Sequence, residues 1–534
     1  MMLKQWFSQR TLVLLLLAVA VHLGAWFFRD TIFSLPCLLA VGVTMGVFSY
    51  QNLRGGLLLA FFEIFIGGHG HLLDADFFGF ALSLRMVIFV GVLTAWAILF
   101  FQKKVSLHWV PLRDLPWIIF MLAIAIGALI GFSQNDFSNA FDDLNSYASI
   151  AFLLPLLSLS WNQEDRRAIL QTLMAAGMWI VGSTLLLSFL FTHLPGKASH
   201  EIYTFVRDSR LAEITLQTVS NSRGEVVEPW MAALFGADGY WYRIFMPSQF
   251  FVIVLLLLFV AAALALYKKE RLSEWITIGL IGGSAALFLS YSRSFFLGLF
   301  CAGIFLIGLI WYFERPNLVH LLKRLSWIGI CGAFGFGLAW MSIAVPIPAQ
   351  PDLTEATFYE TSADTSRSMA VSSRWQLLGP LMESIFASPI LGSGFGKEVT
   401  YISDDPRIRE IDPTGAYTTY RFEWGYQDLW LKMGLLGLVA LVIYTASIAL
   451  GVLFTLHTHG YKWILLGWLS GIAALFVIHI FSPYLNHPIG ITTLMVILPF
   501  LDYQGLLASR EDYRERKNIK TVAMAQPIAS RHES

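Results

Sequence analysis

Apolar stretches long enough to cross a lipid bilayer recur along nearly the whole chain. A membrane-spanning helix needs about 20 apolar residues, and it satisfies its own backbone hydrogen bonds in lipid. Hydrophobic residues make up 56% of the sequence and charged residues only 13%, which excludes an ordinary soluble domain. The sequence therefore predicts an all-α polytopic membrane protein with about 14 transmembrane helices, within a range of roughly 12 to 14. The predicted spans lie near 11–28, 31–50, 55–67, 84–101, 115–132, 147–161, 169–193, 246–267, 275–291, 295–313, 325–345, 427–456, 463–481 and 489–504, of which the third is short.

The basic residues predict how these spans are oriented. Lys and Arg are concentrated in alternate connections, whereas the connection 133–146 on the opposite side carries Asp136, Asp142 and Asp143. Because short cytoplasmic loops are enriched in Lys and Arg, both termini are predicted to be cytoplasmic. We expect the first apolar run to be a retained span, since it continues past the small residues that resemble a signal-peptide cleavage site. The basic connections contain Arg54, Lys103, Lys104, Arg113, Arg166, Arg167, Lys268, Lys269, Arg271, Arg315, Lys323, Arg324 and Lys462.

Two long segments, 194–245 and 346–424, are then predicted to lie on the outer side of the membrane. Long external segments are where a membrane enzyme can build a binding site. We treat 1–504 as a single integral membrane domain. The polar and basic segment 505–534 is predicted to be a disordered cytoplasmic tail.

The segment 372–437 has the most distinctive sequence in the chain. Arg374 precedes apolar residues at helical spacing, and the glycines of 392–396 follow the end of that helix. These glycines, including Gly394, allow backbone N–H groups to approach a ligand such as a phosphate. Glu423 stands directly before an apolar span, where a carboxylate is costly unless it is paired or functional.

The same segment resembles the signature region of the O-antigen ligase and O-antigen polymerase superfamily. The resemblance lies in the order of an arginine, a helix, the turn Pro-Ile-Leu-Gly-Ser-Gly and a membrane helix containing Gly-Leu-Leu-Gly. Members are bacterial glycosyltransferases that use glycans carried on undecaprenyl diphosphate. In one departure, Glu423 and Trp424 stand where the ligases carry His-Asn.

The resemblance implies a multi-pass protein of the bacterial inner, or cytoplasmic, membrane. Its expected partners are a donor oligosaccharide linked to undecaprenyl diphosphate, a glycan or lipid-linked acceptor and the lipid bilayer. A chain-length regulator is a further expected partner, whereas nucleic acid, cofactors and metals are not expected.

Three arginines are candidates for binding the donor. Arg374 has the strongest context, and Arg243 and Arg293 also resemble superfamily positions. Guanidinium groups suit a diphosphate because they stay charged and bind in a bidentate manner. Several of them would stabilise the charge that develops as the sugar–phosphate bond breaks. The alternative for Arg243 is an interfacial arginine among aromatic residues, and the alternative for Arg293 is structural support of a turn.

Glu423 is the candidate catalytic base, with Arg374 and Arg243 as the other predicted catalytic residues. A carboxylate beside the donor site can take the proton from the acceptor hydroxyl as that hydroxyl attacks the anomeric carbon. The alternative is a structural carboxylate paired with Arg421 or Lys432.

A polar cluster follows the third predicted span. Histidines with nearby carboxylates can bind a metal, but a glycine-rich interfacial loop without metal is the favoured interpretation. A second polar pair, in the segment 483–488, is expected to border the outer cavity. The residues are His69, His71, Asp74 and Asp76 in the first group, and Asn486 and His487 in the second.

The favoured function is a polysaccharide polymerase, for O-antigen or exopolysaccharide, at the outer face of the inner membrane. It would transfer an oligosaccharide from undecaprenyl diphosphate to a glycan acceptor. The first alternative is an O-antigen ligase that uses lipid A–core or a protein as acceptor, and the absent ligase histidine favours the polymerase. The second is a transporter or flippase of lipid-linked glycans, although no internal repeat typical of transporters is evident. An envelope scaffold is a third possibility.

Overall fold

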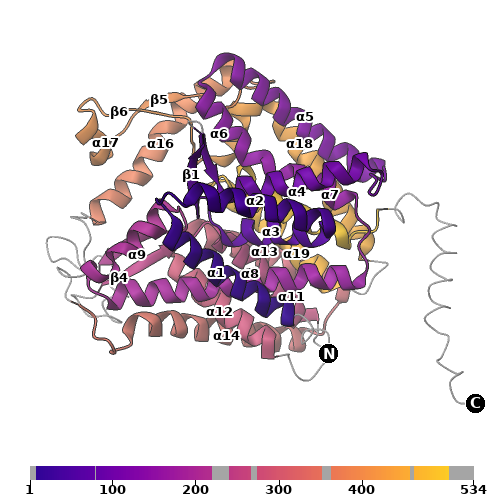
Figure 1. Cartoon of the computed structure of the whole chain (residues 1–534). Coiled ribbons are helices and arrows are strands. Elements are labelled where there is room, and N and C mark those ends of the chain that lie inside the picture. Colours follow the sequence, from indigo (N-terminus) through magenta and orange to yellow (C-terminus); the bar gives the residue numbers. More distant parts are fainter. Residues whose placement is uncertain are drawn as a thin grey trace, which may run out of the picture.

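The protein is a mostly helical bundle (Figure 1). The computed structural model describes residues 8–77, 80–218, 240–265, 274–351, 363–456 and 462–503. Within these ranges, nine helices are long and apolar enough to cross a membrane. They are α1 (Gln9–Phe28), α2 (Ser34–Gln51), α4 (Leu84–Phe101), α5 (Pro111–Gln134), α8 (Gln163–His193), α13 (Arg293–Glu314), α14 (Leu318–Ala344), α18 (Gly425–Thr455) and α19 (Lys462–His479).

Four more predicted spans coincide with shorter helices. These are α3 (Leu53–Ile66), α11 (Gln249–Ala265), α12 (Glu274–Ser290) and α20 (Pro488–Val496). Most residues of α3 are buried, so a helix of 14 residues at this position is enclosed by protein and not by lipid. The polytopic helical class is thus confirmed, while the number of about 14 spans stays a prediction. The predicted tail lies outside the described residues.

The predicted span 147–161 is not one regular helix. After α6 (Phe137–Tyr147), the chain forms a short 3₁₀ helix, η2 (Ala148–Phe152), and the five-residue helix α7 (Leu153–Leu157). Most of these residues are buried. Hydropathy does not show whether an apolar segment is enclosed by other helices or faces lipid, so it did not reveal these short pieces. A membrane crossing at 147–161 stays a prediction.

Helix α11 lies at the centre of the bundle. Fifteen of its residues are buried, and it contacts α8, α12, α13, α14 and α19. A helix that is apolar on every side is stable only when other elements surround it. Its first residue, Gln249, is also buried and donates hydrogen bonds to Thr184 Oγ1 (3.1 Å) and the Ile244 carbonyl (3.0 Å). These bonds tie the central helix to α8 and to the strand that precedes it.

The two predicted external segments contain regular structure. The first contains α9 (Gly196–Asp208) and the antiparallel pair β3 (Glu213–Thr218) and β4 (Tyr240–Phe245). The second contains α16 (Ala363–Ala387), α17 (Pro406–Ile411) and the antiparallel pair β5 (Val399–Ile402) and β6 (Ala416–Thr419). A third hairpin, β1 (Asp74–Phe77) and β2 (Phe80–Ser83), follows α3. Figure 1 shows α9, α16, α17, β4, β5 and β6 on the left of the bundle.

Polar contacts join residues that lie at the same end of the bundle. At one end, Arg54 contacts Asp165 (3.4 Å), which is also in a connection predicted to be cytoplasmic, and Ser160 (2.7 Å), at the end of the predicted span 147–161. At the other end, Arg29 donates to the carbonyl oxygens of His71 (2.7 Å) and Asp208 (2.8 Å), both in segments predicted to be outside. The structure therefore places the predicted outer connections together.

The turn at 389–396 fits into a break in α18. Gly434 has φ +66° and ψ −171°, which interrupts the helix. The turn replaces the lost hydrogen bonds, because Leu435 N–H donates to Pro389 O (2.9 Å) and Ser393 N–H donates to Leu431 O (2.7 Å). A Cβ at Gly434 would collide with the Ile390 carbonyl group, so only glycine fits there.

Candidate functional site

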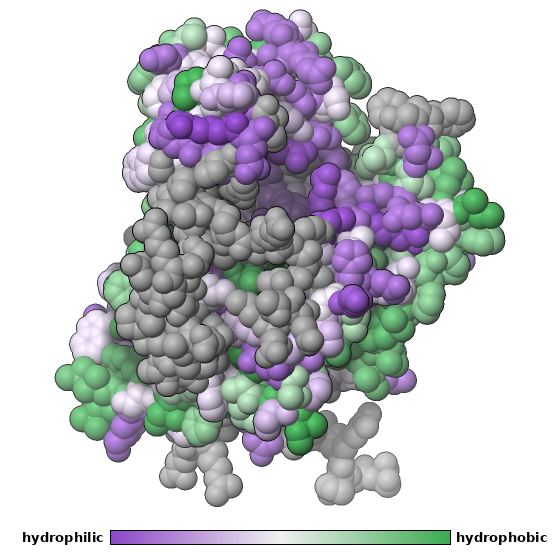
Figure 2. Space-filling view, turned by 90° about the vertical axis from the view of Figure 1, so that its left-hand side faces the viewer, coloured by the Kyte–Doolittle hydropathy of each residue, from purple (hydrophilic) through white to green (hydrophobic). Residues whose placement is uncertain are grey.

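A polar recess opens on the side that carries α9, β4, α16 and β5. Figure 2 shows this side, with a hollow between an upper and a lower part and hydrophilic residues on its upper and right-hand walls. The charged residues predicted from the sequence come from several separate segments. Their contacts, described next, show which of them share this recess.

Arg374 and Glu423 form an ion pair across the gap between α16 and α18. Their side chains are 45% and 51% exposed, so a ligand in solution can reach both. The Trp424 indole N–H donates to the Arg374 carbonyl oxygen (2.9 Å) and fixes the two backbones relative to each other. The two residues predicted to bind the donor and to act as the base are thus direct neighbours.

The alternative partners proposed for Glu423 are wrong. Arg421 instead binds Asp142 on α6 (2.9 Å). Lys432 is only 4% exposed and binds Asp143 on α6 (2.8 Å) and Asp428 on α18 (2.7 Å). Because two carboxylates already hold the buried ammonium group, Glu423 is not needed to neutralise it.

Arg243 lies on β4, where it pairs with Thr215 of β3. Its Nε donates to the Ser290 carbonyl oxygen (2.8 Å), and its guanidinium lies 4.7 Å from the centre of the Phe245 ring. One terminal nitrogen is 4.0 Å from a carboxylate oxygen of Glu213. The backbone thus holds this arginine in a hairpin at the end of α12, and Phe245 agrees with the alternative of an arginine among aromatic residues.

Glu213 connects the two arginines. It lies within ion-pairing distance of Arg243, and β3 contacts α16, which carries Arg374. Burial lowers the pKa of Arg374, and the nearby charge of Glu213 opposes this effect. Glu213, a residue that sequence reasoning missed, therefore lies near Arg243 and Arg374, and Arg374 in turn pairs with Glu423. A single glutamate in a long external segment gave no pattern that could have identified it.

Arg293 is the first residue of α13, and it is exposed. The preceding turn contains Tyr291 in a left-handed conformation with φ +43°. Since Arg243 binds the carbonyl of Ser290, three positions before Arg293, the two arginines belong to adjoining parts of the outer surface. No contact described for Arg293 joins it to Arg374 or Glu423.

Gly394 is buried against α5, and the turn around it faces the protein interior. A Cβ at this position would collide with the backbone of Gly131. Neighbouring N–H groups are also engaged: Phe395 donates to Gly127 O (3.0 Å), and Gly396 donates to Asp143 (2.7 Å). These glycines allow close packing, and we do not include Gly394 in the binding site proposed below.

The four residues considered for a metal do not converge. His71 Nδ1 lies 2.9 Å from Asp74 Oδ2, whereas His69 Nδ1 lies 3.2 Å from Nε2 of His487. Within the described parts of the chain, no three His, Cys, Asp or Glu side chains are grouped as a metal centre would require. Asn486 binds Asp428, so it joins the buried charges of α18 to the outer surface.

The buried charges of α18 were also missed as a group. Lys432 and Asp428 are four residues apart inside a predicted span, which is a sequence signal for paired charges within a membrane helix. The partner Asp143 is 289 positions away in the sequence, so only the structure reveals it.

Comparison with known proteins gives one result. Residues 278–442 match a family model described as O-antigen ligase, and the match contains Arg293, Arg374, Glu423 and the turn docked on α18. No curated protein and no solved structure matches the chain. The match over residues 278–442 supports the resemblance to the O-antigen ligase and polymerase superfamily.

Proposed function

We propose that the protein is a polysaccharide polymerase at the outer face of the bacterial inner membrane. It transfers an oligosaccharide from undecaprenyl diphosphate to a hydroxyl group of a second lipid-linked glycan. One observation carries the proposal: Glu213 lies near both Arg243 and Arg374, and Arg374 pairs with Glu423, so charged residues from separate segments are linked in one group. With the reaction at the outer face, both termini lie in the cytoplasm.

The resting ion pairs suggest how the donor binds. Arg374 faces Glu423, and Arg243 faces Glu213. A diphosphate carries more negative charge than a carboxylate and accepts bidentate hydrogen bonds from guanidinium groups. We propose that the donor diphosphate takes the place of these carboxylates on the two arginines, which releases Glu423 from Arg374.

The released carboxylate then acts on the acceptor. The acceptor oxygen forms a bond with the anomeric carbon, the bond between that carbon and the phosphate oxygen breaks, and the hydroxyl proton passes to Glu423. The arginines stabilise the negative charge of the departing undecaprenyl diphosphate. Donor binding and activation of the base are therefore coupled through one ion pair.

A ligase is the second candidate function, because the matching family model is described as O-antigen ligase. The two functions differ only in the acceptor. The test uses purified full-length protein, a lipid-linked repeat as donor, and either a second lipid-linked repeat or lipid A–core as acceptor. A ladder of lengthened glycans supports the polymerase, and a product formed only with lipid A–core supports the ligase. Absence of any covalent product with both acceptors would contradict both and favour a transporter.

A further inference from the structure

We propose that loop 67–71, together with Arg210 and His487, forms a second anion subsite that binds a phosphate group carried by the acceptor. This inference rests on the proposed transferase function and extends it to the second substrate. All residues of the subsite lie outside residues 278–442, which match the family model.

Glycines bring loop 67–71 between two arginines. Gly68 has φ +56°, and a Cβ there would lie 2.8 Å from the Arg210 carbonyl oxygen. Gly70 has φ +90°, and a Cβ there would lie 2.9 Å from the Arg85 guanidinium. Only glycine allows both approaches, so the loop places His69 between Arg85 and Arg210.

Arg85 is already neutralised, because its Nε binds both carboxylate oxygens of Glu63 at 3.2 and 3.0 Å. Arg210 differs from it. Within the described residues, no carboxylate lies at ion-pairing distance from Arg210, and its side chain is exposed. Arg210 also has φ +51°, a left-handed conformation that costs free energy in a residue other than glycine. The guanidinium of Arg210 thus has no carboxylate partner among the described residues, and its backbone is strained. Both features suit a residue that binds an anionic ligand.

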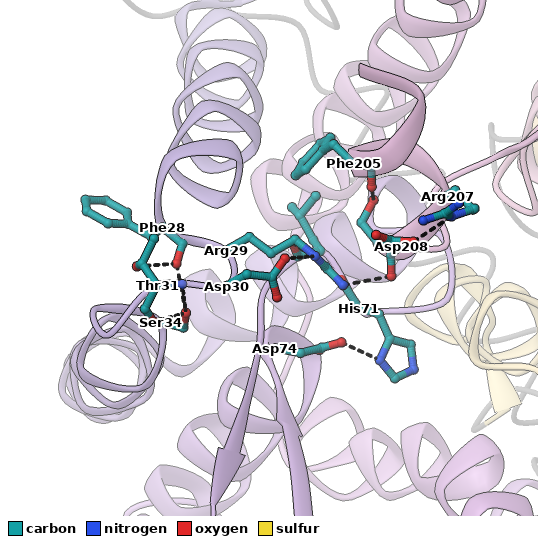
Figure 3. A network of polar contacts seen from close by, with 12 residues as sticks. Phe28, Arg29, Asp30, Thr31, Ser34, His71, Asp74, Phe205, Arg207 and Asp208 are labelled. Atoms are coloured by element: carbon teal, nitrogen blue, oxygen red, sulfur yellow. Dashed lines mark hydrogen bonds and ion pairs between the residues drawn. The ribbon is translucent and has the colours of Figure 1, made fainter. Parts of the chain in front are cut away.

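The histidines position and complete this surface. Figure 3 shows His71 held by Asp74, while Arg29 binds the backbone carbonyls of His71 and Asp208. With its Nδ1–H donated to Asp74, His71 presents Nε2 as the acceptor for Arg210 at 3.4 Å. The guanidinium is therefore oriented by the His71 ring, and no carboxylate of the described residues takes up its charge.

His69 reports the positive character of the recess. The surrounding protein lowers its pKa to about 4, first through loss of solvation and then through the charges of Arg85, His71, Arg210 and Arg421. Burial and the neighbouring His69 and Arg85 also lower the pKa of His487. His487 Nδ1 accepts from Ile489 N–H (3.2 Å), so its Nε2–H donates to His69 Nδ1 (3.2 Å) and leaves the Nε2–H of His69 to donate to a phosphate beside Arg210.

The new subsite adjoins the proposed donor site. Glu213, next to Arg243, follows Arg210 by three positions. The rings of Tyr484 and His487 have their centres 6.3 Å apart. Burial raises the pKa of Tyr484, the charge of Glu213 adds to this effect, and the charge of Arg243 opposes it. Two anion subsites in one recess are what a transferase needs when both substrates carry a phosphate.

The test compares Arg210→Gly with wild type, because glycine removes the guanidinium and still fits the left-handed backbone. Arg207→Ala is the matched control, since Arg207 is three residues away and pairs with Asp208. We expect Arg210→Gly to raise the KM for a phosphorylated acceptor roughly tenfold or more, the effect of one lost charge-assisted hydrogen bond. The KM for the donor and the KM for the same oligosaccharide on a phosphate-free lipid should not change.

Two phosphorylated acceptors, a diphosphate-linked repeat and lipid A–core, show which source of phosphate the subsite uses. Equal KM values for phosphorylated and phosphate-free acceptors in the wild-type enzyme would overturn the inference. Equilibrium binding of farnesyl diphosphate gives a test that does not require turnover. We expect two equivalents of farnesyl diphosphate to bind each wild-type protein and one equivalent to bind each Arg210→Gly variant. One equivalent on wild type would overturn the subsite even if transfer is observed, whereas two equivalents without transfer would overturn only the proposed function.

Discussion

Glu423 and Arg374 show how one ion pair can serve both binding and chemistry. Each side chain is about half exposed, so their attraction is screened by water and contributes little to stability. A diphosphate therefore needs little free energy to separate them. The ion pair is better suited to exchange its partners than to hold α16 against α18, which the Trp424–Arg374 hydrogen bond and the surrounding apolar contacts do.

This interpretation predicts the behaviour of Glu423→Gln. Glutamine keeps the size and polarity of the side chain but cannot accept the acceptor proton, so transfer should fall roughly 10²–10⁴-fold. Donor binding should persist, because the arginines remain. Rates and donor binding are measured on purified protein, with Glu383→Gln, an exposed carboxylate on α16, as control. A variant that unfolds at lower temperature but retains its turnover would remove Glu423 from the mechanism.

The elements show what the sequence can and cannot predict. Hydropathy located α1, α4, α13 and α19 within a few residues, since each has a continuous apolar surface. At 147–161 it did not reveal that the helix is divided into short, mostly buried pieces. The resemblance selected Arg243, Arg374 and Glu423, but Glu213 and Arg210 follow no local pattern. Their importance depends on contacts with segments far away in the sequence, which no local spacing encodes.

The turn docked on α18 leads to a prediction about stability. Gly434→Ala should lower the unfolding temperature clearly, because alanine is disfavoured at φ +66° by roughly 1–2 kcal/mol and its Cβ would displace the turn. Thermal unfolding in detergent provides the measurement. Gly379→Ala on α16 is the control, since no atom lies within 4 Å of its added Cβ. Equal unfolding temperatures for Gly434→Ala and wild type would contradict the packing role of the turn.

At the scale of the whole molecule, the proposed transfer reaction requires the polar recess to lie on the outer side of the membrane, away from the cytoplasm. The contacts of Arg29 and Arg54 separate the two ends of the bundle. The asymmetry of basic residues predicts that the end with Arg54 faces the cytoplasm.

Cysteine labelling tests this orientation. In a variant without Cys37, Cys301 and Cys331, cysteines introduced at Ala198 or Glu410 should react with a membrane-impermeant thiol reagent in intact spheroplasts. A cysteine at Gln163, at the opposite end of α8 from α9, should react only after lysis. The reverse pattern would place the recess in the cytoplasm and rule out the proposed site of reaction.

The central claim is that Arg243 and Arg374 bind one donor diphosphate, and transfer by purified Arg243→Ala and Arg374→Ala variants tests it most directly. Each alanine variant should reduce transfer from a lipid-linked repeat tenfold or more, since a charge-assisted contact to the leaving group contributes about 1.5–3 kcal/mol. Lysine should restore activity only in part, because it supplies the charge without the bidentate geometry. Arg315→Ala, at the opposite end of α13 from Arg293, is the control and should transfer at the wild-type rate. Wild-type transfer by both Arg243→Ala and Arg374→Ala would contradict the account.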